Sequence, residues 1–147
     1  MKKQIKLLKM KCSACLLLLL LIFTACSDDD GNRPAIFGKW KLESETYNGQ
    51  PSTLSECNRE STVEFRTGGT VIFTYHSSNP LNGSCISGEP QLRPWTRDSN
   101  LITVGPTDFD PSYFTDYYTI ISLTNETLTW ERALSGGTII RESYSRQ

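Results

Sequence analysis

The cysteines are the residues of this chain with the most chemistry to offer. Cys12 and Cys15 have the Cys-x-x-Cys spacing of redox and metal sites, but they lie in an apolar leader that we expect to be removed. Cys57 and Cys85 remain, and an even pair in an oxidising compartment favours a disulfide. That bond would stabilise the fold by roughly 3–4 kcal/mol, mainly by restricting the unfolded chain. The alternative is two free thiols for redox work, which no neighbouring histidine supports.

Other reactive side chains do not form a catalytic arrangement. His76 is the single histidine, and without a nearby Ser or Cys nucleophile it makes no triad, so we expect a solvated loop residue. Asp108, Asp110 and Asp116 could offer oxygen ligands to calcium, but their spacing does not match an EF-hand loop. A solvated loop is therefore favoured. We predict no metal site, no cofactor and no enzymatic activity.

The first 26 residues resemble a bacterial lipoprotein signal. A cationic segment at residues 2–11 precedes an apolar run at residues 16–23, which is too short to cross a bilayer. Small residues at 24–25 then precede Cys26, as in a lipobox. The resemblance implies that Cys26 becomes the first residue and carries two or three acyl chains, which anchor a protein stably. The alternatives are an uncleaved anchor, or cleavage without lipidation because Phe23 stands where the lipobox usually has Leu.

The residues after Cys26 bear on location. Ser27 and three aspartates at residues 28–30 resemble a signal that sends lipoproteins to the outer face of the outer membrane. We therefore expect a signal peptide at residues 1–25, an acidic tether at 26–34 and an outer-membrane anchor facing the cell exterior. A solvated tether on a periplasm-facing protein is the alternative.

Removing the leader leaves 122 of the 147 residues, enough for one domain at residues 35–147. All 16 acidic residues are retained, whereas 5 of the 15 basic residues are lost. The remaining 10 basic and 16 acidic residues have a net charge of −6. That balance argues against nucleic acid as a partner, because phosphates call for a basic surface.

The sequence pattern predicts an all-β domain. Short runs of alternating apolar and polar residues are separated by tight-turn residues such as Asn48-Gly49 and Gly136-Gly137. Sequential strands joined by hairpins favour an eight-stranded antiparallel up-and-down barrel, which has no exposed edges. The predicted strands are residues 38–44, 61–66, 70–75, 92–96, 101–104, 117–123, 127–134 and 138–144.

Two connections stand out between these strands. Residues 77–91 are rich in Pro, Gly and Asn and predict a long loop that contains Cys85. Residues 53–59 could form one helical turn, capped by Ser52 or Thr53.

The sequence resembles the lipocalins at Gly38-Lys39-Trp40-Lys41-Leu42, which matches their Gly-x-Trp opening. It is more similar to the lipocalin-like lipoproteins of Gram-negative bacteria, from residue 36 to the end. The matching pieces are residues 48–51, 56–57, 61–65, 68–70, 85, 95, 101–103, 120–124 and 144–147. The resemblance implies an eight-stranded barrel and a lipid anchor. It also implies that Arg146 covers Trp40 at the closed end. Residues 108–114 look like an insertion.

Inward-facing residues are the best functional lead. Alternation places an aromatic set inside the barrel, and Glu142 with it because Ile140 and Tyr144 flank it at the same parity. Acidic residues at 43, 45, 60 and 64 are expected to face outward. The candidate ligand-binding residues are Phe65, Phe73, Tyr75, Tyr118, Trp130 and Glu142.

Two functions remain open at this point. The barrel could hold a small hydrophobic ligand in a cavity, because eight strands enclose just enough space for one. Alternatively, its aromatic residues could fill the interior, and the protein would be a cell-surface scaffold whose loops contact an unidentified protein partner.

Overall fold

The computed structural model describes residues 35–106 and 114–147. The predicted signal peptide, Cys26, the acidic tether, Asp108 and Asp110 lie outside these residues. Within the described residues, no helix is long and apolar enough to cross a membrane.

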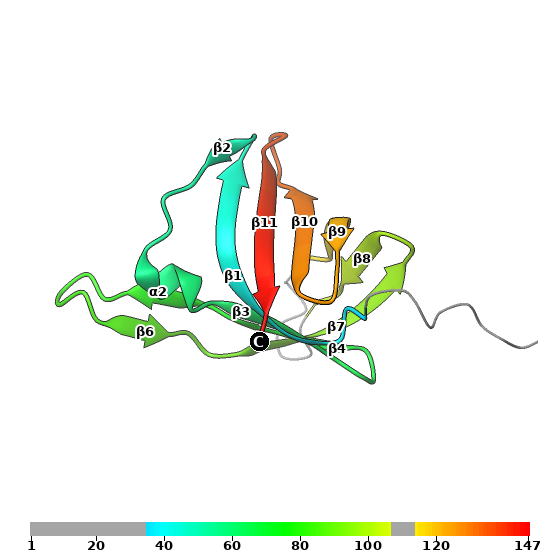
Figure 1. Ribbon diagram of the computed structural model, residues 1–147, viewed down its shortest axis with the longest axis horizontal. Coiled ribbons are helices and arrows are strands. Elements are labelled where there is room, and N and C mark those ends of the chain that lie inside the picture. Colours follow the sequence, from blue (N-terminus) through cyan, green and yellow to red (C-terminus); the bar gives the residue numbers. More distant parts are fainter. Residues whose placement is uncertain (1–34, 107–113) are drawn as a thin grey trace, which may run out of the picture. The chain divides into compact units, whose positions relative to one another are not determined.

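Eight antiparallel strands form a closed barrel (Figure 1), which confirms the predicted fold. Each strand pairs with the next long strand along the chain, and β11 pairs with β1 to close the sheet. The eight strands are β1 (Gly38–Tyr47), β3 (Thr62–Arg66), β4 (Thr70–Thr74), β7 (Gln91–Asp98), β8 (Leu101–Val104), β9 (Asp116–Leu123), β10 (Thr127–Ala133) and β11 (Ile139–Arg146).

A two-residue hairpin extends one end of the barrel. Strand β2 (Gln50–Pro51) pairs with the last residues of β1 through a turn at Asn48 and Gly49. Both turn residues have positive φ, 49° and 79°, as the tight turn that suits twisted strands requires. Asn48 also accepts a 2.8 Å hydrogen bond from the Ile139 amide, so the turn is tied to the start of β11.

The segment predicted as one long loop contains a second hairpin. Strands β5 (His76–Ser78) and β6 (Cys85–Ser87) pair outside the barrel sheet (Figure 1). Backbone hydrogen bonds from Asn79 to Ser84 and from Gly83 to Asn79 close the turn at 2.7 and 2.8 Å. The turn-rich composition of residues 77–91 therefore marks a hairpin tip, and only the remainder is irregular.

The short helix begins later than predicted. Helix α2 (Glu56–Arg59) is capped by Ser55 and not by Ser52 or Thr53. The Ser55 hydroxyl accepts a 3.1 Å hydrogen bond from the Asn58 amide, and the Asn58 side chain accepts one from the Ser55 amide. This reciprocal capping box requires a suitable side chain three residues after the cap, which Asn58 supplies for Ser55.

One end of the barrel is closed by the segment that leads into β1. The indole nitrogen of Trp40 donates a 2.7 Å hydrogen bond to the Ile36 carbonyl, and Trp40 is fully buried. Arg146 lies over the Trp40 ring, 4.2 Å from its centre, and donates to the carbonyls of Ala35 and Phe37. We call this the closed end and the opposite end, where β1 ends and β11 begins, the open end.

The barrel interior next to the closed end, which we call the lower interior, is filled with side chains. A continuous cluster of buried side chains extends from the closed end, and Trp40, Phe65 and Trp130 within it are at most 2% exposed. Edge-to-face aromatic contacts join Phe65 to Trp95 and to Trp130, with ring centres 4.7 and 5.8 Å apart. This part of the interior therefore holds side chains and leaves no lumen.

A candidate ligand pocket at the open end

A pocket of about 340 Å³ lies at the open end, above the solid core. Its walls come from β1, the segment that carries α2, the end of β4, and strands β10 and β11. The volume lies within the roughly 300–1,000 Å³ typical of small-molecule sites. We call this cavity the mouth pocket.

One wall of the mouth pocket is apolar. Leu42, Leu54, Phe73 and Tyr144 line it, and all but Leu54 are at most 7% exposed. Tyr75 stands at the rim, 49% exposed, and stacks on Phe73 with ring centres 6.1 Å apart. An apolar group entering the pocket would meet aromatic faces that are held by the core below.

The facing wall carries charge. Glu142 is only 9% exposed and accepts a 2.6 Å hydrogen bond from the indole nitrogen of Trp130, its cross-strand neighbour. Burial raises the pKa of the Glu142 carboxyl, and the Trp130 hydrogen bond and the positive charge of Arg132 only partly oppose that effect. The site thus holds a carboxyl group with an increased tendency to remain protonated.

Glu45 also lines the mouth pocket, contrary to the prediction that it faces outward. The pairing of β1 with β11 shifts register between Leu42 and Ser44, so one extra residue enters β1 at this point. A bulge of this kind reverses the faces of all later residues in the strand. Glu45 is therefore the direct neighbour of Glu142 across the sheet, and its charge further raises the pKa of Glu142.

All six predicted ligand-binding residues meet in one cluster, but they occupy two levels. Phe73, Tyr75 and Glu142 line the mouth pocket. Phe65, Tyr118 and Trp130 belong to the core beneath, where each is at most 3% exposed. The ring of Tyr118 joins the two levels, 4.5 Å from Trp130 and 6.3 Å from Phe73 between centres.

The sequence interpretation missed several pocket residues. Tyr144 was placed inward with Glu142 but was not named as a ligand residue, and Arg132 has the inward parity of Trp130, so alternation alone could have found it. No periodic signal points to Tyr47, because it follows the bulge in β1, or to Leu54, because it lies in an irregular segment.

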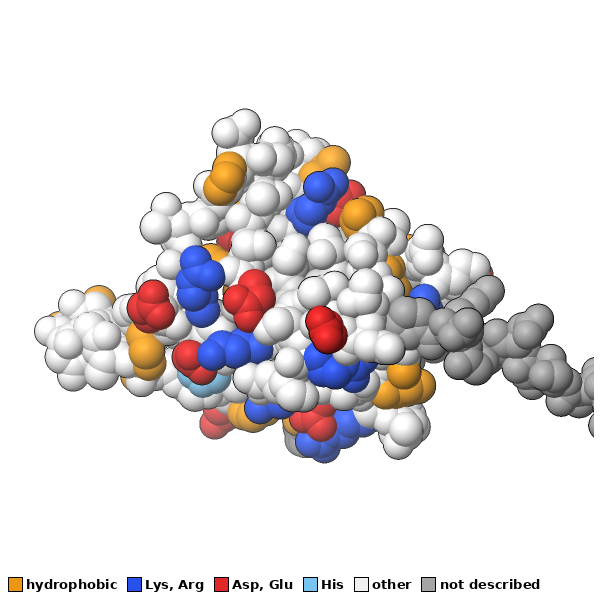
Figure 2. Space-filling view, in the orientation of Figure 1, with side chains coloured by type: hydrophobic (Ala, Val, Ile, Leu, Met, Phe, Trp, Pro, Cys, Tyr) orange, Lys and Arg blue, Asp and Glu red, His pale blue; other side chains and the backbone are white. Residues whose placement is uncertain are grey.

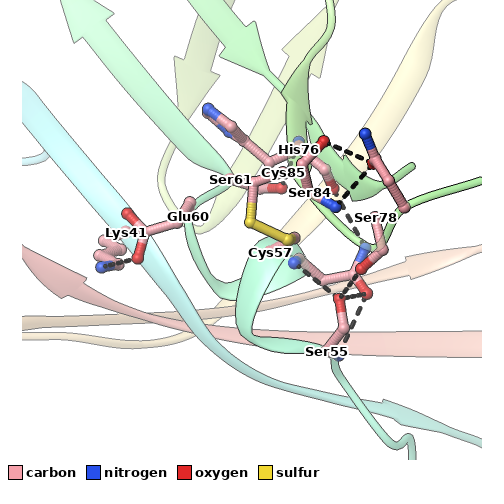
Figure 3. The surroundings of a disulfide bond; sticks show 11 residues. Lys41, Ser55, Cys57, Glu60, Ser61, His76, Ser78, Ser84 and Cys85 are labelled. Carbon is pink, nitrogen blue, oxygen red and sulfur yellow. Dashed lines mark hydrogen bonds and ion pairs between the residues drawn. A yellow bond between two sulfur atoms is a disulfide. The ribbon is translucent and has the colours of Figure 1, made fainter.

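The disulfide forms as predicted and supports the side of the pocket. Cys57 in α2 is joined to Cys85 in β6, with their Cα atoms 5.2 Å apart (Figure 3). Next to it, the Asn58 side chain donates to the His76 carbonyl at 3.1 Å, and the His76 amide donates to the Ser61 hydroxyl at 2.9 Å. His76, predicted as a solvated loop residue, therefore lies at the pocket wall.

Asp116, the described member of the candidate calcium group, has a structural partner. It forms a 2.6 Å ion pair with Arg93, whose side chain is buried at 5% exposure. Arg93 also donates hydrogen bonds to the carbonyls of Gly105 and Phe114. An outer hollow of about 330 Å³ beside β9 and β10 includes Asp116 and Glu131. Glu131 is paired with Arg141, so both of these carboxylates already have a cation.

The outer surface mixes its charges. Figure 2 shows acidic and basic side chains interleaved on one face. The outer ion pairs include Lys41 with Glu60 at 2.8 Å and Arg141 with Glu131 at 2.6 Å. Because these surface charges already have partners, the mouth pocket is a better candidate than the outer surface for a specific interaction.

Together these features define a small eight-stranded barrel with one closed end and a pocket at the other. Residues 36–130 match the family model described as the lipocalin-like domain. The chain therefore belongs to the lipocalin-like domain family.

Solved structures agree on the fold. An uncharacterized protein from Bacteroides eggerthii superposes with a TM-score of 0.52 at 12% identity, covering 77% of this chain and 100% of that one. A lipocalin-like protein from Bacteroides uniformis superposes with a TM-score of 0.50 at 11% identity, covering 76% of this chain and 98% of that one. No curated protein matches the chain.

Proposed function

We propose that this protein is a lipid-anchored lipoprotein of the outer membrane whose barrel binds a small hydrophobic molecule at its open end. The mouth pocket carries the proposal, because the closed end and lower interior are filled and this cavity is bounded by buried aromatic and aliphatic side chains. The anchor rests on the resemblance of the first 26 residues to a lipoprotein signal, and outward display rests on the three aspartates at residues 28–30.

Binding of a neutral, environment-sensitive dye such as Nile red tests the pocket. The whole chain carrying Cys26→Ser is used, so that no acyl group of its own competes. We expect one dye per protein with micromolar affinity, about −8 kcal/mol. Leu54→Trp should abolish binding because it fills the pocket from a partly buried position.

A matched control is Leu92→Trp, which makes the same change at a half-exposed site on β7 that does not line the pocket. It should bind the dye as the unmodified protein does. Phe73→Arg should also prevent binding, and thermal unfolding will show whether that variant still folds. Absence of binding by the parent protein, or equal binding by Leu54→Trp, would contradict the proposal.

The alternative is a surface scaffold without a ligand. The solid lower interior favours it, as does the β5–β6 hairpin, which carries Leu81 at 93% exposure. A folded protein that does not bind the dye would support this second function.

A further inference from the structure

Arg132 is the one cation among the described residues that line the mouth pocket. It has the same parity on β10 as the buried Trp130, and it lines both the mouth pocket and the outer hollow beside β9 and β10. Its Nε atom is buried and has no hydrogen-bond acceptor among the described residues. A buried donor without an acceptor destabilises the protein, so this group gains from any ligand that offers an oxygen there.

Among the described residues, Glu142 attracts Arg132 electrostatically but does not form a close contact with it. Within the described part of the chain, neither Glu142 nor Glu45 forms an ion pair with it. Glu142 accepts the 2.6 Å hydrogen bond from Trp130, and burial together with a hydrogen bond to Glu45 raises the pKa of Tyr47. The attraction of Glu142 thus leaves the Arg132 Nε atom without an acceptor, and the arginine retains its charge at every physiological pH.

Tyrosine side chains also line the pocket near Arg132, and the hydroxyl of Tyr144 is hydrogen-bonded to Glu142. Tyr75 stands at the rim and Tyr144 lies in the wall beside Glu142. Across the cavity, Leu42, Leu54 and Phe73 form the apolar wall. Arg132 and Glu142 thus place charge on the β10 and β11 side of the pocket, whereas Leu42, Leu54 and Phe73 supply apolar contacts across it.

We infer that the ligand of the mouth pocket is an amphiphile with a carboxylate head group, which Arg132 binds, and an apolar tail that lies against Leu54 and Phe73. This inference rests on the proposed function and adds the chemical class of the ligand. Glu45 and Glu142 would limit the affinity by repulsion, most of all where both are ionised.

Three ligands with the same tail test the head group. Decanoate, decanol and decylamine are each titrated against the dye complex of the Cys26→Ser chain near neutral pH. Decanoate should displace the dye at a concentration about tenfold lower than decanol and decylamine require, as expected for one hydrogen-bonded charge pair. Equal potency of the three ligands, or a preference for decylamine, would overturn the inference. Dye binding by the parent protein would still support the proposed function in that case.

Variants then locate the interaction. Arg132→Gln should raise the concentration of decanoate needed by about tenfold and remove the preference over decanol, whereas Arg132→Lys should keep part of it. Glu45→Gln should tighten decanoate binding, because it removes a repelling charge. Arg141→Gln, on the outward side of β11, should change nothing. Weaker decanoate binding in Glu45→Gln, or an undiminished preference in a folded Arg132→Gln, would contradict the assignment.

Discussion

The carboxylate of Glu142 and the indole of Trp130 face each other across β10 and β11 and share a 2.6 Å hydrogen bond inside the barrel. Trp130 is fully buried and Glu142 nearly so. The bond satisfies the indole N–H, which would otherwise be a buried donor without an acceptor. It also holds the carboxyl group at the boundary between the solid core and the mouth pocket.

The raised pKa of Glu142 predicts a pH-dependent stability. The folded protein binds the Glu142 proton more tightly than the unfolded chain does, so this contribution is complete below the unfolded pKa and is lost as pH rises through the folded pKa. Glu142→Gln keeps an acceptor for Trp130 but cannot ionise. The free energy of unfolding, measured by chemical denaturation, should therefore fall less between about pH 5 and pH 8 in the variant than in the parent. Glu131→Gln, on the outer surface, is the control, and identical pH slopes in all three proteins would refute the assignment.

Arg146 should contribute measurably to stability. Its guanidinium covers Trp40 and donates to the carbonyls of Ala35 and Phe37, which fastens the segment before β1 to the closed end. Arg146→Gln should lower the free energy of unfolding by about 1–3 kcal/mol in urea denaturation. Arg141→Gln removes an exposed ion pair on the same strand and should cost less than about 1 kcal/mol. Equal effects of the two changes would show that Arg146 has no special role.

The disulfide should stabilise the protein chiefly through the unfolded state. Cys57→Ser should lower the free energy of unfolding by about 3–4 kcal/mol, since it releases a cross-link between residues 28 positions apart. The variant should leave the barrel intact, because the link joins α2 to the β5–β6 hairpin outside the barrel sheet. Unchanged stability of the variant, or alkylation of both thiols in the native oxidised parent, would argue against this role.

Acylation of Cys26 is expected from the residues before it. Intact-mass analysis of membrane-extracted protein should find a chain that begins at Cys26 and carries acyl mass. Cys26→Ser should release the protein from the membrane fraction. A chain that starts at Cys26 without added mass would mean that the leader is cut without lipidation.

Surface display is expected from the acidic run at residues 28–30. Protease added to intact cells should digest the parent protein. Replacing the three aspartates with alanine should protect it, and a periplasmic marker should stay intact in both strains. Protection of both forms would indicate an anchor that faces the periplasm.

Local chain chemistry was enough to predict the barrel. Alternation and tight turns located all eight long strands, and the cysteine pair and the contact of Arg146 with Trp40 follow from spacing or family resemblance. These features could be predicted because strand periodicity and turn preferences act over a few residues.

Position along the barrel axis could not be predicted in this way. Phe65 and Phe73 share the same inward parity, yet one is sealed in the core and the other lines a cavity. Which of them meets empty space depends on where residues 52–58 cross the open end, and no periodic pattern specifies that path.

The sequence by itself determined the order in which the strands pair and, outside the part of β1 that follows its bulge, which predicted pocket residues face the interior, because strand periodicity and turn preferences act over a few residues. Only the tertiary structure decided that Glu45 joins Glu142 at the pocket, because a single bulge in β1 reverses the local parity. It also decided where packing stops and the cavity starts, because that boundary depends on side-chain volumes summed across all eight strands.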